Sequence, residues 1–281
     1  MPRVNLSRVN LQKTLFILPN LFTLSSIFCG FQSILWSAGL MGDDLTRGET
    51  LWKSALAIVF AMFFDIADGR VARLTKTQSA LGVQLDSLAD AISFGVAPAL
   101  LVYRWGLFGM GKAGALIAFI FLACGVIRLA RFNVMAAKDG GASHYSLGIP
   151  IPLGAACIVS LVIAQQGAPN QMAHSPLLQQ GVIAALVLLL SYLMVSTVRF
   201  RTFKDLFYSK SSALLFVGGS AFSFAISWAL LGPQAGWVLL AASSYTYILL
   251  GFLEAVFSFG VKRRDERKLR EEGDSAPSHQ E

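Results

Sequence analysis

The sequence predicts an all-α, polytopic integral membrane protein with about eight transmembrane helices. Of its 281 residues, 55% are hydrophobic and 14% are charged, and the mean hydropathy is +0.61, which argues against a soluble two-domain protein. Apolar runs of about 20 residues are long enough to cross a hydrocarbon core of roughly 30 Å. Such runs occur near residues 15–36, 51–72, 83–103, 112–131, 149–166, 179–198, 212–231 and 237–259.

The basic residues predict how these spans are oriented. Short cytoplasmic loops of membrane proteins collect Lys and Arg. If the N-terminus lies in the cytoplasm, all but four of the 23 basic residues lie on the cytoplasmic side, the exceptions being Arg47, Lys53, Arg104 and Lys112. We therefore expect a protein of the cytoplasmic (inner) membrane with both termini in the cytoplasm. The net charge of +7 then reflects orientation and contact with anionic lipids.

The first span follows a segment that contains basic residues, at positions 1–14. No small-residue cleavage site follows this segment, so a removable signal peptide is not expected. The next two spans are unusual because they carry acids.

Spans two and three contain four aspartates in otherwise apolar sequence. Residues three or four apart share a helix face, so Asp65 and Asp68 project together from span two. Asp86 and Asp90 likewise project together from span three. With a rise of about 1.5 Å per residue, the two pairs lie at matched depth, roughly 6 to 12 Å below the cytoplasmic edge. The antiparallel hairpin therefore brings four carboxylates to one point.

Four neighbouring carboxylates require a counter-charge, because like charges and burial both disfavour ionisation. Oxygen ligands without His or Cys suit hard divalent cations such as Mg²⁺ or Mn²⁺. Two such ions, bridged by the carboxylates, would form a clamp for a phosphate group. The alternatives are that the acids are protonated or that they pair with arginines of other spans.

Small residues lie on the same helix faces as the acids, namely Gly69, Ala72 and Gly82. They either leave room for a ligand or serve as close contacts between helices. Arg73 lies at the cytoplasmic mouth of the hairpin, where it either pairs with a phosphate or sets the orientation of the span.

The spacing of these residues resembles the complete signature of the CDP-alcohol phosphatidyltransferase family, with all eight positions matched: Asp65, Asp68, Gly69, Ala72, Arg73, Gly82, Asp86 and Asp90. The resemblance implies a six-helix core and transfer of a phosphatidyl group from CDP-diacylglycerol to an alcohol, with release of CMP. It implies that the first three acids are metal ligands, and that Asp90 binds the second ion and acts as general base. It also implies that Gly69, Arg73 and Ser79 contact the CDP group, in a pocket that Ala72 and Gly82 would line.

Further segments resemble the bacterial and archaeal phosphatidylserine synthases of this superfamily: "LPNLFTLSSIFCGF" from Leu18, "DSLADAISFGVAPA" from Asp86, "RLARFN" from Arg128, "GIPIP" from Gly148 and "RFRTFK" from Arg199. This resemblance implies that the acceptor is the hydroxyl of L-serine and that the product is phosphatidylserine. Ser26 stands where the pattern has Asn.

Serine carries a carboxylate that the site must bind. We expect this role for Arg128, Arg131 and Asn133 at the cytoplasmic end of span four; otherwise they are orientation-setting residues with snorkelling side chains. In span one, Asn20 and Thr23 either face the nucleotide or satisfy the backbone groups that a kink at Pro19 frees.

The resemblance divides the chain into four parts. A cytoplasmic segment at 1–14 precedes the phosphatidyltransferase core at 15–205, two additional transmembrane helices follow at 206–260, and 261–281 form a charged cytoplasmic tail. The active site is expected to face the cytoplasm.

Other functions stay open. Glycerol 3-phosphate or inositol phosphate could be the acceptor, although either would demand more basic groups for its extra phosphate. A divalent-cation transporter would place its site near the midplane between broken helices, whereas the sequence has no Pro between Phe63 and Gly95. The expected partners are CDP-diacylglycerol, L-serine and membrane lipids, with no nucleic acid. A homodimer is compatible with the sequence, which sets no oligomeric state.

Overall fold

The computed structural model describes residues 11–41, 45–75, 79–138, 145–167, 176–196 and 199–201. The predicted spans at 212–231 and 237–259, the charged tail and most of the N-terminal segment lie outside the described residues. In chain order the elements are α1 (Leu11–Ala38), α2 (Arg47–Thr75), α3 (Ala80–Asp90), the π-helical turn η1 (Ala91–Val96), α4 (Ala97–Val102), a second π-helical turn η2 (Tyr103–Leu107), the 3₁₀ turn η3 (Phe108–Met110), α5 (Lys112–Lys138), β1 (Tyr145–Leu147), α6 (Ile151–Gly167), α7 (Pro176–Val195) and β2 (Arg199–Arg201).

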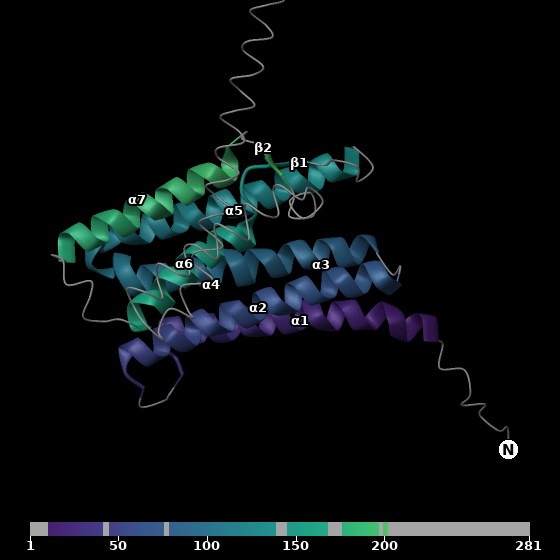
Figure 1. Cartoon of the computed structure of the whole chain (residues 1–281), viewed down its shortest axis with the longest axis horizontal. Coiled ribbons are helices and arrows are strands. Elements are labelled where there is room, and N and C mark those ends of the chain that lie inside the picture. Colours follow the sequence, from purple (N-terminus) through teal and green to yellow (C-terminus); the bar gives the residue numbers. More distant parts are fainter. Residues whose placement is uncertain are drawn as a thin grey trace, which may run out of the picture.

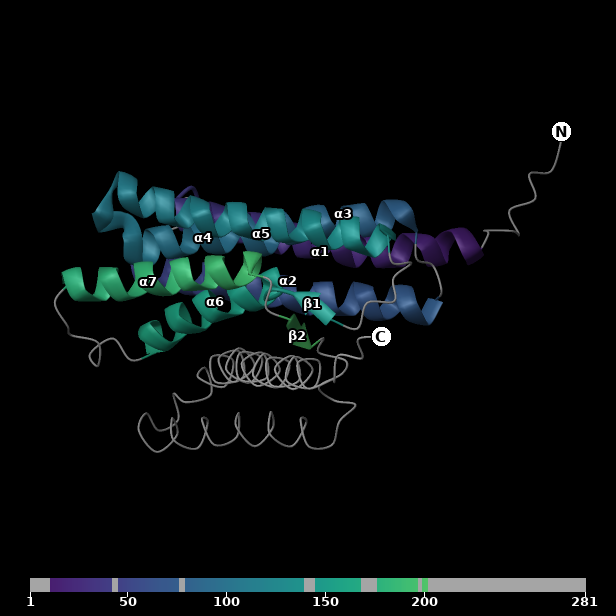
Figure 2. The ribbon, with the colours of Figure 1, turned by 90° about the horizontal axis from the view of Figure 1, so that it is seen from above.

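The long helices run side by side in an elongated bundle (Figure 1). Helix α1 packs along α2, α5 packs along α7, and α6 lies against α2 (Figure 2). Within the described ranges, four helical stretches are long and apolar enough to cross a membrane, namely Pro19–Ala38, Leu81–Met110, Lys112–Ala137 and Leu178–Val195. A shorter apolar helix covers Ile151–Gln165. The prediction of a helical, polytopic membrane protein is therefore confirmed.

Two three-residue strands are an addition to the predicted helical fold. Strand β1 pairs antiparallel with β2, so that Ser146 lies opposite Phe200. The pairing joins the segment before α6 to the segment after α7. Three residues are too few for the alternating pattern by which a strand is found in a sequence.

Helix α2 begins with a capping box. The backbone N–H of Thr46 donates to Glu49 Oε2 at 2.8 Å, and the backbone N–H of Glu49 lies 3.4 Å from Thr46 Oγ1. Each side chain thus satisfies a backbone donor of the other, which stabilises the first turn. The hydrogen bonds from Thr46 also lower the pKa of Glu49 below its ordinary value.

The third predicted span, 83–103, belongs to a longer helical run over residues 80–110. The two π-helical turns η1 and η2 interrupt the α-helical hydrogen bonding of this run. Such turns contain one residue more than an α-helical turn. A continuous apolar run gives no signal for that insertion, so the sequence predicted a regular helix here.

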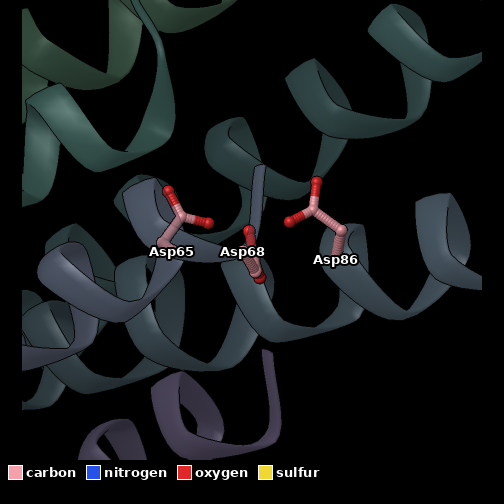
Figure 3. Close-up of side chains that lie close together, drawn as sticks. All are labelled: Asp65, Asp68 and Asp86. Carbon is pink, nitrogen blue, oxygen red and sulfur yellow. The ribbon is translucent and has the colours of Figure 1, made fainter. Parts of the chain in front are cut away.

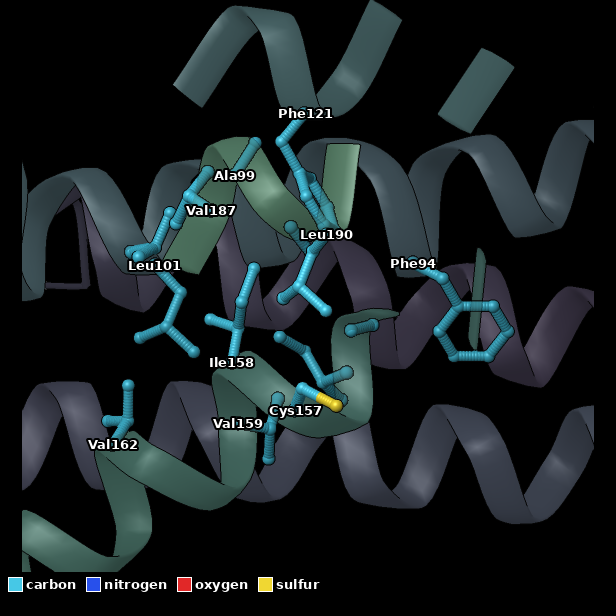
Figure 4. Close-up of a cluster of buried hydrophobic side chains, with 14 of the residues drawn as sticks. Phe94, Ala99, Leu101, Phe121, Cys157, Ile158, Val159, Val162, Val187 and Leu190 are labelled. Carbon is cyan, nitrogen blue, oxygen red and sulfur yellow. The ribbon is translucent and has the colours of Figure 1, made fainter. Parts of the chain in front are cut away.

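The core lies mainly where α4, α5, α6 and α7 meet (Figure 4). Its fully buried side chains include Phe94, Leu101, Phe121, Ile158 and Leu190. Because lipid tails are as apolar as these side chains, close packing rather than transfer from water holds such a core together in a membrane.

Buried hydroxyl groups join α1 to α2. Ser54 donates to the backbone carbonyl of Ser33 at 3.0 Å, and its Oγ lies 2.7 Å from Ser33 Oγ and 2.6 Å from Ser37 Oγ. Such hydrogen bonds between small residues hold membrane helices together at close range.

Candidate metal centre

Three aspartates converge between α2 and α3 (Figure 3). Asp65 and Asp68 come from α2 and Asp86 comes from α3, and one carboxylate oxygen of each lies within 4.8 Å of the other two. Acidic oxygens at this spacing form a ligand set for a hard divalent cation. The helix spacing places two of them on one face of α2, and the packing of α3 on the same side of the bundle supplies the third.

Asp90 lies one turn further along the same helix, at its last α-helical residue. Its carboxyl group interacts with that of Asp65. Its Oδ1 atom is buried and has no hydrogen-bond partner in the part of the chain that the structure describes. A buried carboxylate oxygen without a donor is costly, and a cation between the two carboxylates would offset that cost. The three clustered acids therefore form a candidate site for a divalent cation, and the buried carboxyl group of Asp90 lies next to it.

Thr23 orients one of these acids from α1. Its hydroxyl donates to Asp68 Oδ2 at 2.8 Å and lies 3.1 Å from the backbone carbonyl of Pro19. Both side chains are buried, with 4% of Thr23 and 6% of Asp68 exposed. A metal-binding carboxylate that accepts such a bond is held in one orientation. The hydroxyl thus contacts both the backbone of α1 one turn earlier and the acid cluster.

Three of the residues expected at the nucleotide lie together at the start of α3. The N-cap residue Ser79 accepts a hydrogen bond from the backbone N–H of Gly82 at 3.0 Å. A Cβ atom added at Gly82 would lie 3.2 Å from Ser79 Oγ and 3.8 Å from Asn20 Oδ1. A side chain at position 82 would therefore fill the space between α1 and the first turn of α3.

Three more of the expected nucleotide contacts lie near the end of α2, and the seventh, Thr23, lies on α1. Gly69, Ala72 and Arg73 follow Asp68 in the last two turns of that helix, and Gly69 and Ala72 are half-buried. They occupy the side of the acid cluster toward the connection between α2 and α3.

Helix α5 places a cation beside the cluster. Arg128 is 7% exposed and interacts electrostatically with Asp90. Its guanidinium carbon lies 5.6 Å from the centre of the Phe132 ring. Asn133 lies further along α5 and donates to Ser87 Oγ at 2.8 Å, which ties α5 to α3 beside the acids.

Arg131 faces a different partner. Its guanidinium donates to the backbone carbonyls of Val195 at 2.8 Å, Ser196 at 3.2 Å and Met194 at 3.3 Å. These are carbonyl groups at the C-terminal end of α7, where a cation is also favoured by the helix dipole. Of the three basic or amide residues expected at the acceptor, Arg131 therefore lies on the end of α7 and Arg128 beside the acids.

Sequence reasoning did not single out Ser87, the partner of Asn133. Ser87 directly follows Asp86 in the signature, so its place next to the acids was visible in the sequence. The contact of its side chain could not be predicted from the sequence, because only the packing of α5 on α3 shows which side of α3 Asn133 meets.

The chain matches the sequence model of the CDP-alcohol phosphatidyltransferases over residues 16–193, which is more than half of its length. It is 37% identical to a CDP-diacylglycerol–serine O-phosphatidyltransferase of Helicobacter pylori over 191 residues, covering 68% of this chain and 74% of the relative. It is 32% identical to the enzyme of the same name from Bacillus subtilis over 187 residues, covering 66% of this chain and 91% of the relative. A third relative of that name, from Saccharomyces cerevisiae, is 39% identical over 145 residues, half of this chain and 51% of the relative.

Proposed function

Because this chain belongs to the CDP-alcohol phosphatidyltransferase family, we propose that it transfers the phosphatidyl group of CDP-diacylglycerol to the hydroxyl of L-serine. The products would be phosphatidylserine and CMP. The names of the relatives from H. pylori, B. subtilis and S. cerevisiae support serine as the acceptor. The observation that carries the proposal is the position of Asp90, whose buried Oδ1 lacks a partner among the described residues, next to the cluster of three acids.

The family depends on divalent cations. We propose two ions, Mg²⁺ or Mn²⁺, whose ligands are Asp65, Asp68, Asp86 and, for the second ion, Asp90. When bound, the ions neutralise the diphosphate and the leaving CMP. Thr23 keeps the carboxylate of Asp68 turned toward the cluster through its 2.8 Å hydrogen bond.

Asp90 is the proposed general base. The hydroxyl proton of serine moves to the carboxylate of Asp90 while the serine oxygen attacks the phosphorus attached to the diacylglycerol oxygen. The bond from that phosphorus to the bridging oxygen of CMP then breaks. A carboxylate is a weak base for a hydroxyl, so the contribution of Asp90 depends on its orientation within hydrogen-bonding distance.

The CDP group is proposed to lie across the cytoplasmic end of the hairpin. Its contacts would come from α1, from the end of α2 and from the start of α3: Asn20, Thr23, Gly69, Ala72, Arg73, Ser79 and Gly82. The proximity of Asn20, Ser79 and Gly82 supports this placement.

The serine carboxylate is proposed to bind near Arg128, with Arg131 and Asn133 on the same helix. Of the three, Arg128 is the residue that interacts electrostatically with the proposed base Asp90. Because Arg131 donates to α7 and Asn133 donates to Ser87, we expect Arg128 to make the direct contact.

The apolar helices place the protein in a membrane. We propose that the site faces the cytoplasm, as the distribution of basic residues predicts. There the diphosphate stays near the headgroups while the acyl chains remain in the bilayer. The core at 15–205 would carry the chemistry, with the helices at 206–260 and the tail at 261–281 outside it.

The test is an assay of purified protein in detergent with CDP-diacylglycerol, Mn²⁺ and labelled L-serine, glycerol 3-phosphate or inositol phosphate. We expect CMP and labelled lipid with serine alone. Asp90→Asn should lower kcat by about 10²- to 10⁴-fold, the usual contribution of a general base. Glu49→Gln, which neutralises an exposed acid at the other end of α2, serves as the control and should keep full activity. A rate of CMP release that does not depend on serine would contradict the proposal. So would an unchanged rate in Asp90→Asn.

A further inference from the structure

The helix that carries Asp90 changes its hydrogen bonding directly after that residue. In η1 the backbone N–H of Ala97 donates to the carbonyl of Ile92, five residues earlier instead of four. A π-helical turn contains one extra residue, so it rotates the helix before it relative to the helix after it. The direction of the Asp90 side chain therefore depends on how η1 is held.

Ser93 fixes η1 against α1. Its hydroxyl donates to the backbone carbonyl of Ser26 at 2.9 Å, and the Ser26 hydroxyl lies 3.4 Å from Ser93 Oγ as a donor. Both residues are buried, with 0% of Ser93 and 1% of Ser26 exposed. Water does not replace such a contact inside an apolar span, so α1 and η1 are tied together at this point.

Gly30 lets the two backbones approach each other. A Cβ atom added at Gly30 would lie 2.8 Å from the Cα atom and 2.6 Å from the Oγ atom of Ser93. Carbon atoms pack at about 3.5 to 4.0 Å, so any side chain at position 30 would have to displace η1. The close approach is thus a property of this helix pair and not of a flexible side chain.

The same turn also contacts α5 and α6. A Cβ atom added at Gly95 would lie 2.9 Å from Leu122 Cδ1 on α5 and 3.6 Å from Ile151 Cδ1 on α6. Phe94, which lies between Ser93 and Gly95 in the chain, is fully buried in the core (Figure 4). Three consecutive residues of η1 are therefore packed, and the turn is held from more than one direction.

We propose that Ser93 is a positioning residue for Asp90: its contact with Ser26 and Gly30 of α1 fixes η1 and thereby sets the height and rotation of the Asp90 carboxyl beside Asp65. The inference rests on the proposed function, in which Asp90 accepts the proton of serine. Ser93 acts through the backbone of η1, three residues after Asp90.

Such positioning is expected to affect the chemical step more than substrate binding. A general base must lie roughly 2.6 to 3.2 Å from the oxygen whose proton it takes. A displacement of about 1 Å can cost about 10²-fold in rate. The proposed CDP contacts lie on α1, on α2 and at the start of α3, before η1, so binding of CDP-diacylglycerol should change little.

The test compares Ser93→Ala with Ser54→Ala in the purified full-length protein. Each change removes a buried hydroxyl that ties another element to α1, but Ser54 lies 11 residues before Asp65, about 16 Å along α2. We expect Ser93→Ala to lower kcat about tenfold or more while KM for CDP-diacylglycerol changes less than about twofold. Its Mn²⁺ affinity, measured by electron paramagnetic resonance, should fall about tenfold. Ser54→Ala should keep the kcat and the Mn²⁺ affinity of the parent protein, and only its melting temperature should be lower.

Gly30→Ala probes the same contact by pushing η1 away, and we expect a larger loss of kcat. If Gly30→Ala does not fold, Ser93→Ala still decides the question, because it adds no volume. Equal kcat and equal Mn²⁺ affinity in Ser93→Ala and Ser54→Ala would overturn the proposal. A parent protein without serine-dependent CMP release would contradict the proposed function instead, and the Mn²⁺ titration would still report whether Ser93 shapes the acid cluster.

Discussion

The hydroxyl of Thr23 on α1 donates a hydrogen bond to Oδ2 of Asp68 on α2 over 2.8 Å, between residues 45 positions apart in the sequence. Through this bond α1, which contains no acidic residue itself, helps to orient the acid cluster. Residues that hold a metal ligand in this way commonly affect metal affinity or activity by about 10- to 100-fold when they are replaced.

Two replacements of Thr23 should therefore separate the effect of its side-chain shape on metal binding from the effect of its hydrogen bond. Thr23→Val keeps the branched side chain but removes the donor, and we expect Mn²⁺ affinity and kcat to fall about 10- to 100-fold. Thr23→Ser keeps the hydroxyl and should restore most of the loss. Isothermal titration with Mn²⁺ and a CMP-release assay measure the two effects. If Thr23→Val binds Mn²⁺ as the parent does, the hydrogen bond has no part in metal binding.

Removal of divalent cations should abolish activity and lower stability. A ligand that binds only the folded state at 100 times its Kd stabilises that state by about 2.7 kcal/mol. We expect chelation to stop CMP release and to lower the melting temperature in detergent, and Mn²⁺ or Mg²⁺ to restore both. In Asp86→Asn, which removes a member of the cluster, added Mn²⁺ should raise the melting temperature much less. Full activity in the presence of chelator would rule out the metal centre.

Arg128→Gln tests the proposed contact with the serine carboxylate. A hydrogen bond to a charged group contributes about 1.5 to 3 kcal/mol, so the KM for serine should rise about 10- to 100-fold. The KM for CDP-diacylglycerol should stay close to that of the parent. Initial rates over a serine titration give both values. An unchanged KM for serine would assign Arg128 to another role, such as balancing the charge of Asp90.

In contrast to Arg128→Gln, Arg131→Gln should lower the stability of the protein and leave the KM for serine almost unchanged. The guanidinium donates to three carbonyls at the end of α7, so its loss should destabilise the protein by about 1.5 to 3 kcal/mol. The expected readout is a lower melting temperature with little change in the KM for serine. Arg131→Lys keeps the charge without the planar fork of donors and should recover only part of the stability. A rise in the KM for serine at unchanged melting temperature would instead favour direct contact with the acceptor.

Gly148→Ala should destabilise the junction between β1, α6 and α7. Gly148 has a φ of 75°, and a Cβ atom there would lie 2.1 Å from the carbonyl oxygen of Met194. Strain of this kind costs about 1 to 3 kcal/mol before the steric overlap is added. Gly181→Ala on α7 is the matched control, since its Cβ atom would meet nothing within 4 Å and should add roughly 0.5 to 1 kcal/mol of stability. Melting temperatures that fall equally in both variants would contradict this account.

Much of the fold and of the candidate site could be predicted from the sequence, because both rest on spacing within single helices. Apolar runs predicted the positions of α1, α2, α5, α6 and α7 and of the helical run over residues 80–110. The spacing of Asp65 and Asp68 placed both acids on one face, and the predicted hairpin brought Asp86 to them. The orientation toward the cytoplasm, drawn from the basic residues, stays a prediction.

Contacts between distant segments were decided only by the tertiary structure. The sequence left two roles open for Thr23 and grouped Arg131 with Arg128, yet Thr23 contacts Asp68 and Arg131 contacts the end of α7. The π-helical turn that follows Asp90 was equally invisible. Helical periodicity is local, repeating every 3.6 residues, and therefore determines which residues share a face. Which face meets which neighbour depends on how the whole bundle packs, including where small residues such as Gly30 allow close approach.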